Sequence, residues 1–204
     1  MKNVITAGVS LAEAEKALIM IHGRGAAAQD ILSIANYLDV ENFALVAPQA
    51  AGNTWYPLSF LATPQQNEPY LSNALSLLAD VVSDIESNGI VKNNIYFLGF
   101  SQGACLTAEF TARNAAKYGG VVIFTGGLIG DTLYTENYKG NFAGTPVFIG
   151  TSNPDFHVPV ARVTATEEVF KKMGAHVTLK IYENMPHTIS QDEIDNANKL
   201  VFKK

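Results

Sequence analysis

A single serine lies between two different sequence patterns in the segment Ile95-Tyr96-Phe97-Leu98-Gly99-Phe100-Ser101-Gln102-Gly103-Ala104. The apolar, β-prone run 95–98 predicts a strand that is buried on both faces of a parallel sheet. Helix formers with apolar positions follow over residues 104–117, so a helix is expected to start directly after the serine. The turn that joins the strand to the helix therefore has almost no residues besides Ser101.

Two glycines flank this serine at positions −2 and +2. A tight strand-to-helix turn forces its apex residue into a strained backbone conformation, and only small neighbours let the two elements pack so closely. Gly99 and Gly103 supply those neighbours. The pattern Gly-x-Ser-x-Gly, preceded by a strand and followed by a helix, is the nucleophile elbow of the α/β-hydrolases. Ser101 is accordingly the predicted nucleophile.

Strand and helix patterns alternate along most of the chain. Apolar runs predict strands at residues 4–7, 17–21, 43–47, 95–98, 121–124, 146–149 and 177–182, and helical spacing predicts helices at 30–38, 69–88, 164–173 and 191–202 besides the helix after the elbow. Such alternation is typical of βαβ units with right-handed crossovers. We therefore predict a single α/β-hydrolase domain over residues 1–204, with a mostly parallel sheet of about six or seven strands, helices on both faces and no lid domain.

The composition and net charge of the chain exclude several classes of protein. A chain of 204 residues with 48% apolar residues can bury one sizeable core. A net charge of −5 disfavours nucleic acid as a partner. The N-terminus lacks a long apolar segment and the run 17–21 is too short to span a bilayer, so we expect no transmembrane segment and a cytoplasmic protein. The single Cys105 allows no internal disulfide.

A serine hydroxyl needs a general base and a group that orients the base. In this fold these groups follow the serine in the order acid, then histidine, and they lie beyond the carboxyl ends of the strands. Asp155 follows the second strand after the elbow, and His187 lies in the loop after the final strand. Ser101, Asp155 and His187 are therefore the predicted catalytic residues.

Alternatives to this assignment stay open from the sequence. Asp131 follows the preceding strand and is a second candidate for the acid, while Asp155 could serve only an Asx-type turn and His187 could be a loop histidine without a role.

Other polar or reactive residues have simpler interpretations. His157 is expected at the rim of the site, and His176 at the surface where a strand starts. Cys105 falls one turn into the elbow helix, where a buried, unreactive side chain is expected. His22 has no second ligand at metal-binding spacing, so its expected role is structural.

The reaction also needs two N–H donors for the oxyanion of the tetrahedral intermediate. The backbone N–H of Gln102, at the helix N-terminus, is one candidate. The backbone N–H of Arg24, in the turn His22-Gly23-Arg24-Gly25, is the other. For the Arg24 side chain a surface pair with a carboxylate is favoured over contact with an anionic part of a substrate.

Several segments together resemble the phospholipase/carboxylesterase family of α/β-hydrolases, which includes acyl-protein thioesterases and is related to dienelactone hydrolases. The matching segments are residues 18–25 (Leu-Ile-Met-Ile-His-Gly-Arg-Gly), 46–48 (Val-Ala-Pro), 99–104 (Gly-Phe-Ser-Gln-Gly-Ala), 155–159 (Asp-Phe-His-Val-Pro) and 185–187 (Met-Pro-His). The resemblance implies an esterase or thioesterase that works through an acyl-enzyme, with the catalytic and oxyanion residues named above. In acyl-protein thioesterases the sequence of this first turn is similar to His-Gly-Leu-Gly. The arginine at position 24 is therefore a departure from their pattern.

An open cleft bordered by residues 55–60 and 126–129 is expected to bind the substrate. Trp55, Tyr56, Leu128 and His157 are the predicted substrate-binding residues, and short-chain or aryl carboxylic esters the predicted substrates. Thioesters and lysophospholipids remain alternatives, as do an acyltransferase and a catalytically silent binding protein. The partner is a small-molecule ester, no metal or organic cofactor is needed, and the sequence leaves open whether the chain forms a homodimer.

Overall fold

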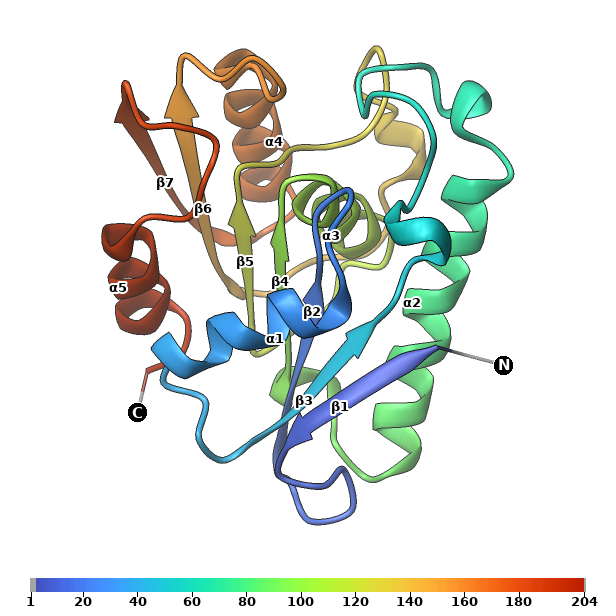
Figure 1. Cartoon of the computed structure of the whole chain (residues 1–204), viewed down its shortest axis with the longest axis vertical. Coiled ribbons are helices and arrows are strands. Elements are labelled where there is room, and N and C mark those ends of the chain that lie inside the picture. The colour runs from blue at the N-terminus through green and yellow to red at the C-terminus, as the bar shows by residue number, and fades with distance from the viewer. Residues whose placement is uncertain (1–2, 204) are drawn as a thin grey trace.

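A seven-stranded sheet forms the centre of the molecule (Figure 1). The computed structural model describes residues 3–203. The strands are β1 (Val4–Gly8), β2 (Lys16–Ile21), β3 (Phe43–Pro48), β4 (Ile95–Phe100), β5 (Gly120–Phe124), β6 (Pro146–Asn153) and β7 (His176–Glu183). Their order in the sheet is β1-β3-β2-β4-β5-β6-β7, and only β1 runs antiparallel to its neighbour. This arrangement confirms the predicted mostly parallel α/β sheet.

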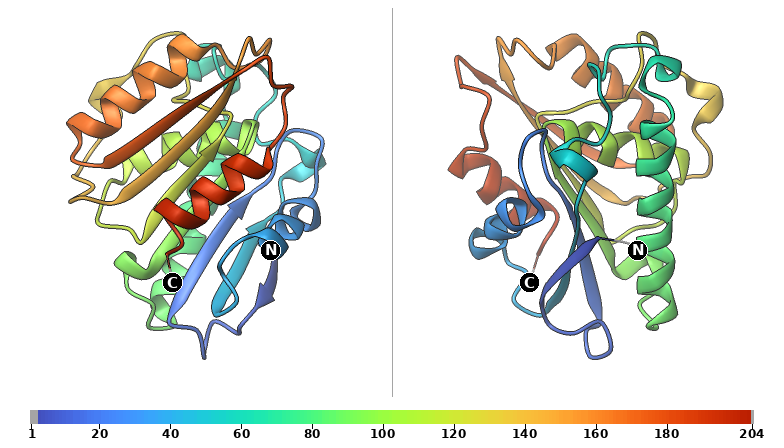
Figure 2. Two further views of the ribbon diagram at one scale, coloured as in Figure 1. Left: turned by 90° about the vertical axis from the view of Figure 1, so that its left-hand side faces the viewer. Right: turned by 45° about the vertical axis from the view of Figure 1, so that its right-hand side comes forward.

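Residues 3–203 form five α-helices. They cover the two faces of the sheet (Figure 2). They are α1 (Ala28–Ser33), α2 (Tyr70–Ser87), α3 (Gln102–Arg113), α4 (Val160–Lys172) and α5 (Gln191–Leu200). Helices α1 and α5 share one apolar cluster with the sheet, and α2, α3 and α4 share the other. Along β2 the side chains alternate between these clusters, because successive residues of a strand point to opposite faces. The sheet is thus buried on both faces, and residues 3–203 contain no inserted lid domain.

Several elements differ in extent from their predictions: α3 ends at Arg113 instead of residue 117, and α4 begins at Val160 instead of residue 164. The helix expected over residues 30–38 is α-helical only to Ser33 and continues as a 3₁₀ turn at Ile34–Tyr37, a tightening that is common where α-helices end. Strand β6 extends beyond its apolar run through three polar residues to Asn153. It does so because β7 pairs with it along its whole length, from Pro146↔His176 to Asn153↔Glu183.

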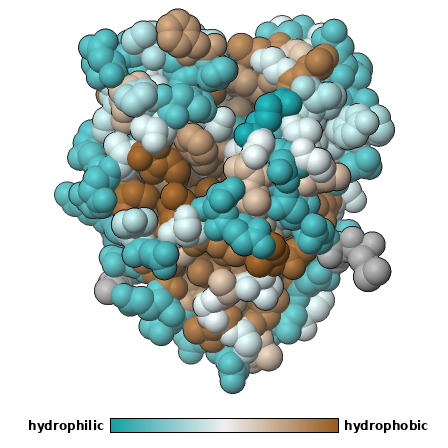
Figure 3. Space-filling model, viewed as in Figure 1, coloured by the Kyte–Doolittle hydropathy of each residue, from teal (hydrophilic) through white to brown (hydrophobic). Residues whose placement is uncertain are grey.

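Apolar side chains are visible in the middle of the face that carries α1 and α5 (Figure 3). A pocket of about 380 Å³ on this face is lined partly by Ile31, Ile34 and Ile189. Ser101 and His187 do not line it, so it is separate from the predicted site. Over residues 3–203, no helix is both long enough and apolar enough to cross a lipid bilayer.

Candidate active site

Ser101 occupies the strained turn between β4 and α3. Its backbone angles are φ 54° and ψ −118°, a region that non-glycine residues rarely adopt. A Cβ atom added to Gly99 would lie 2.4 Å from the Gly103 carbonyl oxygen, and one added to Gly103 would lie 2.1 Å from the Ile21 carbonyl oxygen. The two glycines are therefore required by close backbone contacts, as their spacing in the sequence predicts.

Three side chains from separate loops form a continuous hydrogen-bonded chain. The Nε2 atom of His187 lies 2.9 Å from Ser101 Oγ, and its Nδ1 atom lies 2.6 Å from Asp155 Oδ2. An ionised carboxylate only accepts hydrogen bonds, so the Nδ1–H of a neutral His187 donates to Asp155. This tautomer leaves the lone pair of Nε2 facing the Ser101 hydroxyl, which is the geometry that a general base needs.

Asp155 is held in its ionised form by several donors. Its Oδ1 atom accepts the backbone N–H groups of His157 at 2.7 Å and Val158 at 2.9 Å, and its Oδ2 atom also accepts the Ser152 hydroxyl at 3.0 Å. Burial raises the Asp155 pKa, but the hydrogen bonds from His187 and from the two N–H groups outweigh burial, and the net pKa is lowered. The carboxylate can therefore stabilise a positively charged His187.

The competing candidates lie elsewhere. Asp131 is exposed, and its Oδ1 atom accepts the Tyr134 hydroxyl at 2.8 Å, with no bond to His187. His176 is exposed at the start of β7. Cys105 is buried, and burial raises the pKa of its thiol to about 12, which leaves it protonated and a poor nucleophile at neutral pH.

Two backbone N–H groups near Ser101 have no acceptor among the described residues. Helix α3 begins at Gln102, so the Gln102 N–H has no intrahelical acceptor. The Arg24 N–H donates to no other protein group within residues 3–203. A Cβ atom added to Gly23 would lie 3.5 Å from Ser101 Cβ, which places the turn that contains Arg24 against the serine.

The His22 side chain stabilises this turn through hydrogen bonds. Its Nδ1–H donates to the Gly23 carbonyl at 2.7 Å, and its Nε2 atom accepts the Ala50 N–H at 3.1 Å. The indole of Trp55 packs on the His22 ring at a centroid distance of 4.9 Å and donates to the His22 carbonyl at 2.8 Å. Burial lowers the His22 pKa, so the ring is neutral, as both bonds require. Among the residues described, no group of His, Cys, Asp or Glu side chains has metal-binding geometry.

The Arg24 side chain does not form the predicted pair with a surface carboxylate. Its guanidinium donates instead to the Thr54 hydroxyl and to the carbonyls of Tyr56, Pro57 and Leu58. The expectation was wrong because the acceptors, three backbone carbonyls and one hydroxyl, belong to a loop about 30 residues away in the sequence. Nothing in the composition of that loop indicates that its carbonyls converge.

A pocket of about 440 Å³ opens beside Ser101. Its lining residues are Arg24, Tyr56, Pro57, Leu58, Ser59, Phe60, Ser101, Gln102, Cys105, His157, Val158 and His187. Two of the predicted substrate-binding residues, Tyr56 and His157, are among them, and the His157 ring lies 5.2 Å from the His187 ring. Sequence reasoning missed Pro57 and Leu58 as individual contacts, although both belong to the loop that it selected.

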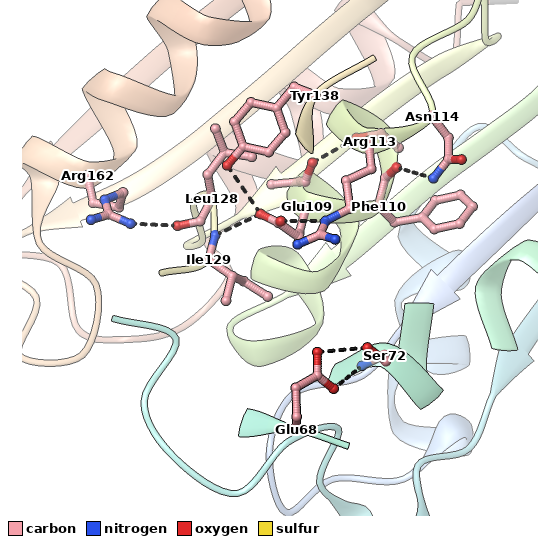
Figure 4. A network of polar contacts seen from close by, with 12 residues as sticks. Glu68, Ser72, Glu109, Phe110, Arg113, Asn114, Leu128, Ile129, Tyr138 and Arg162 are labelled. Carbon is pink, nitrogen blue, oxygen red and sulfur yellow. Dashed lines mark hydrogen bonds and ion pairs between the residues drawn. The ribbon is translucent and has the colours of Figure 1, made fainter. Parts of the chain in front are cut away.

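Trp55 and Leu128 do not line this pocket, contrary to the prediction. Trp55 is 4% exposed and packs on His22, and Leu128 is fully buried. The backbone around Leu128 is tied to the interior: its carbonyl accepts Arg162 Nη1 at 3.0 Å, and the N–H of the next residue, Ile129, donates to Glu109 at 3.0 Å (Figure 4). The loop 126–129 therefore does not border the pocket.

The strand order, the elbow and the helices on both faces define an α/β-hydrolase fold. The family model described as phospholipase/carboxylesterase matches residues 5–203. The chain therefore belongs to the phospholipase/carboxylesterase family. The crystal structure of a phospholipase/carboxylesterase from Dyadobacter fermentans DSM 18053 is similar over 100% of this chain and 97% of its own, with 53% identity and a TM-score of 0.98.

More distant relatives share the fold or part of the sequence. The Bacillus cereus carboxylesterase structure covers 98% of this chain and 92% of its own, with 18% identity and a TM-score of 0.79. Acyl-protein thioesterase 1 of Gibberella zeae is 28% identical over 61% of this chain, and its Saccharomyces cerevisiae counterpart is 25% identical over 64%. The matched region spans only 53% and 59% of the lengths of these two thioesterases.

Proposed function

We propose that this protein is a serine carboxylesterase that hydrolyses short-chain or aryl carboxylic esters through an acyl-enzyme. The observation that carries the proposal is the chain of hydrogen bonds from Ser101 through His187 to Asp155, at 2.9 and 2.6 Å. The strained backbone at Ser101 and the membership in the phospholipase/carboxylesterase family support it.

In the proposed mechanism, His187 Nε2 removes the proton of Ser101 while Oγ attacks the ester carbonyl. The resulting oxyanion accepts the backbone N–H groups of Arg24 and Gln102, at the N-terminus of a helix whose dipole also favours negative charge. His187 then gives its proton to the departing alcohol, which leaves Ser101 acylated. Asp155 stays ionised throughout and stabilises the charged imidazole.

A water molecule completes the cycle in the second half of the reaction. His187 takes a proton from the water, whose oxygen attacks the acyl carbonyl, and the same proton returns to Ser101 Oγ as the carboxylic acid leaves. Each half-reaction starts and ends with a neutral His187.

The residues that line the pocket support the proposal that the substrate carries a small acyl or aryl group. Tyr56, Phe60 and Cys105 line it with buried side chains, and Pro57 and Leu58 add apolar surface near its mouth. The acyl-protein thioesterases among the relatives give the alternative, a thioesterase or lysophospholipase that accepts long acyl chains. Chain-length preference separates these two substrate classes.

The test is the hydrolysis of p-nitrophenyl acetate, butyrate, octanoate and palmitate by the wild type and by Ser101→Ala, together with mass analysis after treatment with a fluorophosphonate. We expect turnover of the short esters and one label on the wild type, with neither on the variant. A rate that peaks at palmitate would favour the thioesterase alternative. A wild type that is neither active nor labelled would instead favour the catalytically silent binding protein.

A further inference from the structure

Both terminal nitrogens of the Arg24 guanidinium bind one loop. Nη1 donates to the Thr54 hydroxyl and the Pro57 carbonyl, both at 2.9 Å, and Nη2 donates to the carbonyls of Tyr56 at 2.9 Å and Leu58 at 2.7 Å. These four bonds use all four hydrogens on the two terminal nitrogens. An arginine is suited to this task because its planar fork presents several donors in a fixed geometry, which a lysine cannot reproduce.

The Gln102 side chain, next to Ser101 in the sequence, binds the same loop. Its Oε1 atom accepts the Trp55 backbone N–H at 3.0 Å, and its Nε2 atom donates to the Tyr56 carbonyl at 2.8 Å. The side chain is only 6% exposed, so both bonds are shielded from water. The Tyr56 carbonyl therefore accepts hydrogen bonds from both Arg24 and Gln102.

The loop in question, residues 54–58, is also a wall of the pocket. Tyr56, Pro57 and Leu58 line the pocket beside Ser101. Arg24 and Gln102 are the two residues whose backbone N–H groups serve as oxyanion donors in the proposed mechanism. The two donor residues thus hold the pocket wall with their side chains.

We propose that the side chains of Arg24 and Gln102 are positioning groups that fix the pocket wall and the two oxyanion donors relative to each other. This inference rests on the proposed function. Its consequence is that loss of the guanidinium fork disturbs the donors, and hence transition-state stabilisation, more than it disturbs substrate binding. A second consequence concerns charge: the guanidinium serves loop carbonyls, so it does not act as a recognition site for a substrate carboxylate.

The experiment compares Arg24→Gln and Arg24→Lys with the wild type on two esters that differ by one carboxylate, phenyl acetate and 4-acetoxybenzoate. We expect both variants to lose about tenfold to a hundredfold in kcat, by the same factor for the two esters, with a smaller change in KM. Lysine keeps the charge but not the fork, so it should not rescue. The shape of the pH–rate profile should match that of the wild type, because the bonds of His187 to Ser101 and Asp155 are not touched.

Arg162→Lys is the matched control. Arg162 also binds three loop carbonyls, that of Leu128 (Figure 4) and those of Gly130 and Asp131, but none of these residues lines the pocket. We expect this variant to keep kcat within about twofold while its thermal unfolding midpoint falls. The comparison distinguishes the effect of losing any arginine that binds loop carbonyls from the effect of losing Arg24, which binds the loop at the pocket wall.

Several outcomes would overturn the inference. Wild-type kcat in Arg24→Gln would show that the wall and the donors are not coupled. A loss confined to 4-acetoxybenzoate, with recovery in Arg24→Lys, would assign Arg24 to carboxylate recognition. If Arg24→Gln does not fold, Gln102→Leu and Thr54→Val, which remove three and two of the hydrogen bonds between the loop and these two side chains, must show the same kcat loss in graded form. A wild type inactive on all esters would refute the proposed function itself, whereas an active wild type with unaffected variants would refute only the positioning role.

Discussion

Replacing Gly103 with alanine should separate the first turn of α3 from the end of β2. The new Cβ atom would lie 2.1 Å from the Ile21 carbonyl oxygen and 2.5 Å from that of His22, whereas Cβ contacts under 3.0 Å essentially never occur. The backbone must therefore move by about 0.9 Å, the difference between 3.0 and 2.1 Å. Because Ser101 and the Gln102 N–H lie on this turn, a displacement of that size should lower kcat by about a hundredfold.

The same overpacking should lower the free energy of unfolding by about 1–3 kcal/mol. For a chain of this length, that corresponds to a fall of about 2–12 °C in the thermal unfolding midpoint. The assay combines thermal unfolding with the kcat for p-nitrophenyl butyrate, measured well below the midpoint of each variant.

Gly119→Ala is the control for overpacking remote from Ser101. Its Cβ atom would lie 2.3 Å from the Tyr96 ring, so it should destabilise the fold while leaving kcat near the wild-type value. If Gly103→Ala kept both wild-type kcat and wild-type stability, close contact at the elbow could not be the reason for the glycine, and our account of that turn would be wrong.

Two further predictions concern the charge states of the site. Asp155→Asn should lower kcat by about 10³–10⁴-fold, because an amide cannot stabilise a charged His187, and a variant within tenfold of the wild type would remove Asp155 from the mechanism. The second concerns His22, whose folded-state pKa is lowered by burial. The unfolded state gains a proton that the folded state resists, so the His22 contribution to stability is complete above about pH 6.5 and decreases as the pH falls toward the lowered pKa. Urea unfolding at pH 8 and pH 5.5 should show this loss in the wild type and a smaller loss in His22→Gln; equal losses would exclude His22 as its source.

The sequence allowed the fold and the central serine to be predicted because the constraints there are local. An apolar strand, a turn with no spare residues and two glycines can be combined in few ways, and the contacts of Gly99 and Gly103 show why. The positions of Asp155 and His187 followed from chain order, since each lies just after a strand of the same sheet. The fold brings the two side chains to 2.6 Å, as that order leads one to expect.

What could not be predicted depends on contacts between distant backbone atoms. The acceptors of Arg24 are carbonyls, which every residue has, so no residue type marks them. Trp55 and Leu128 were placed at the pocket because each follows a strand end, but both turn inward and pack in the core. Their apolar character favours burial as much as substrate contact, and only the path of the loop decides between the two.

The pairing of β7 with a single neighbour has a practical consequence for how the protein is monitored. His187 follows β7, an edge strand whose only strand partner among the described residues is β6, whereas the sole tryptophan packs on His22 on the other side of Ser101. Elements with few buried side chains open more readily in local fluctuations, and none of the residues of β7 is fully buried. Fluorescence of Trp55 therefore reports on the half of the site that carries the oxyanion donors, and catalytic activity is the more sensitive indicator of order at the β7 edge.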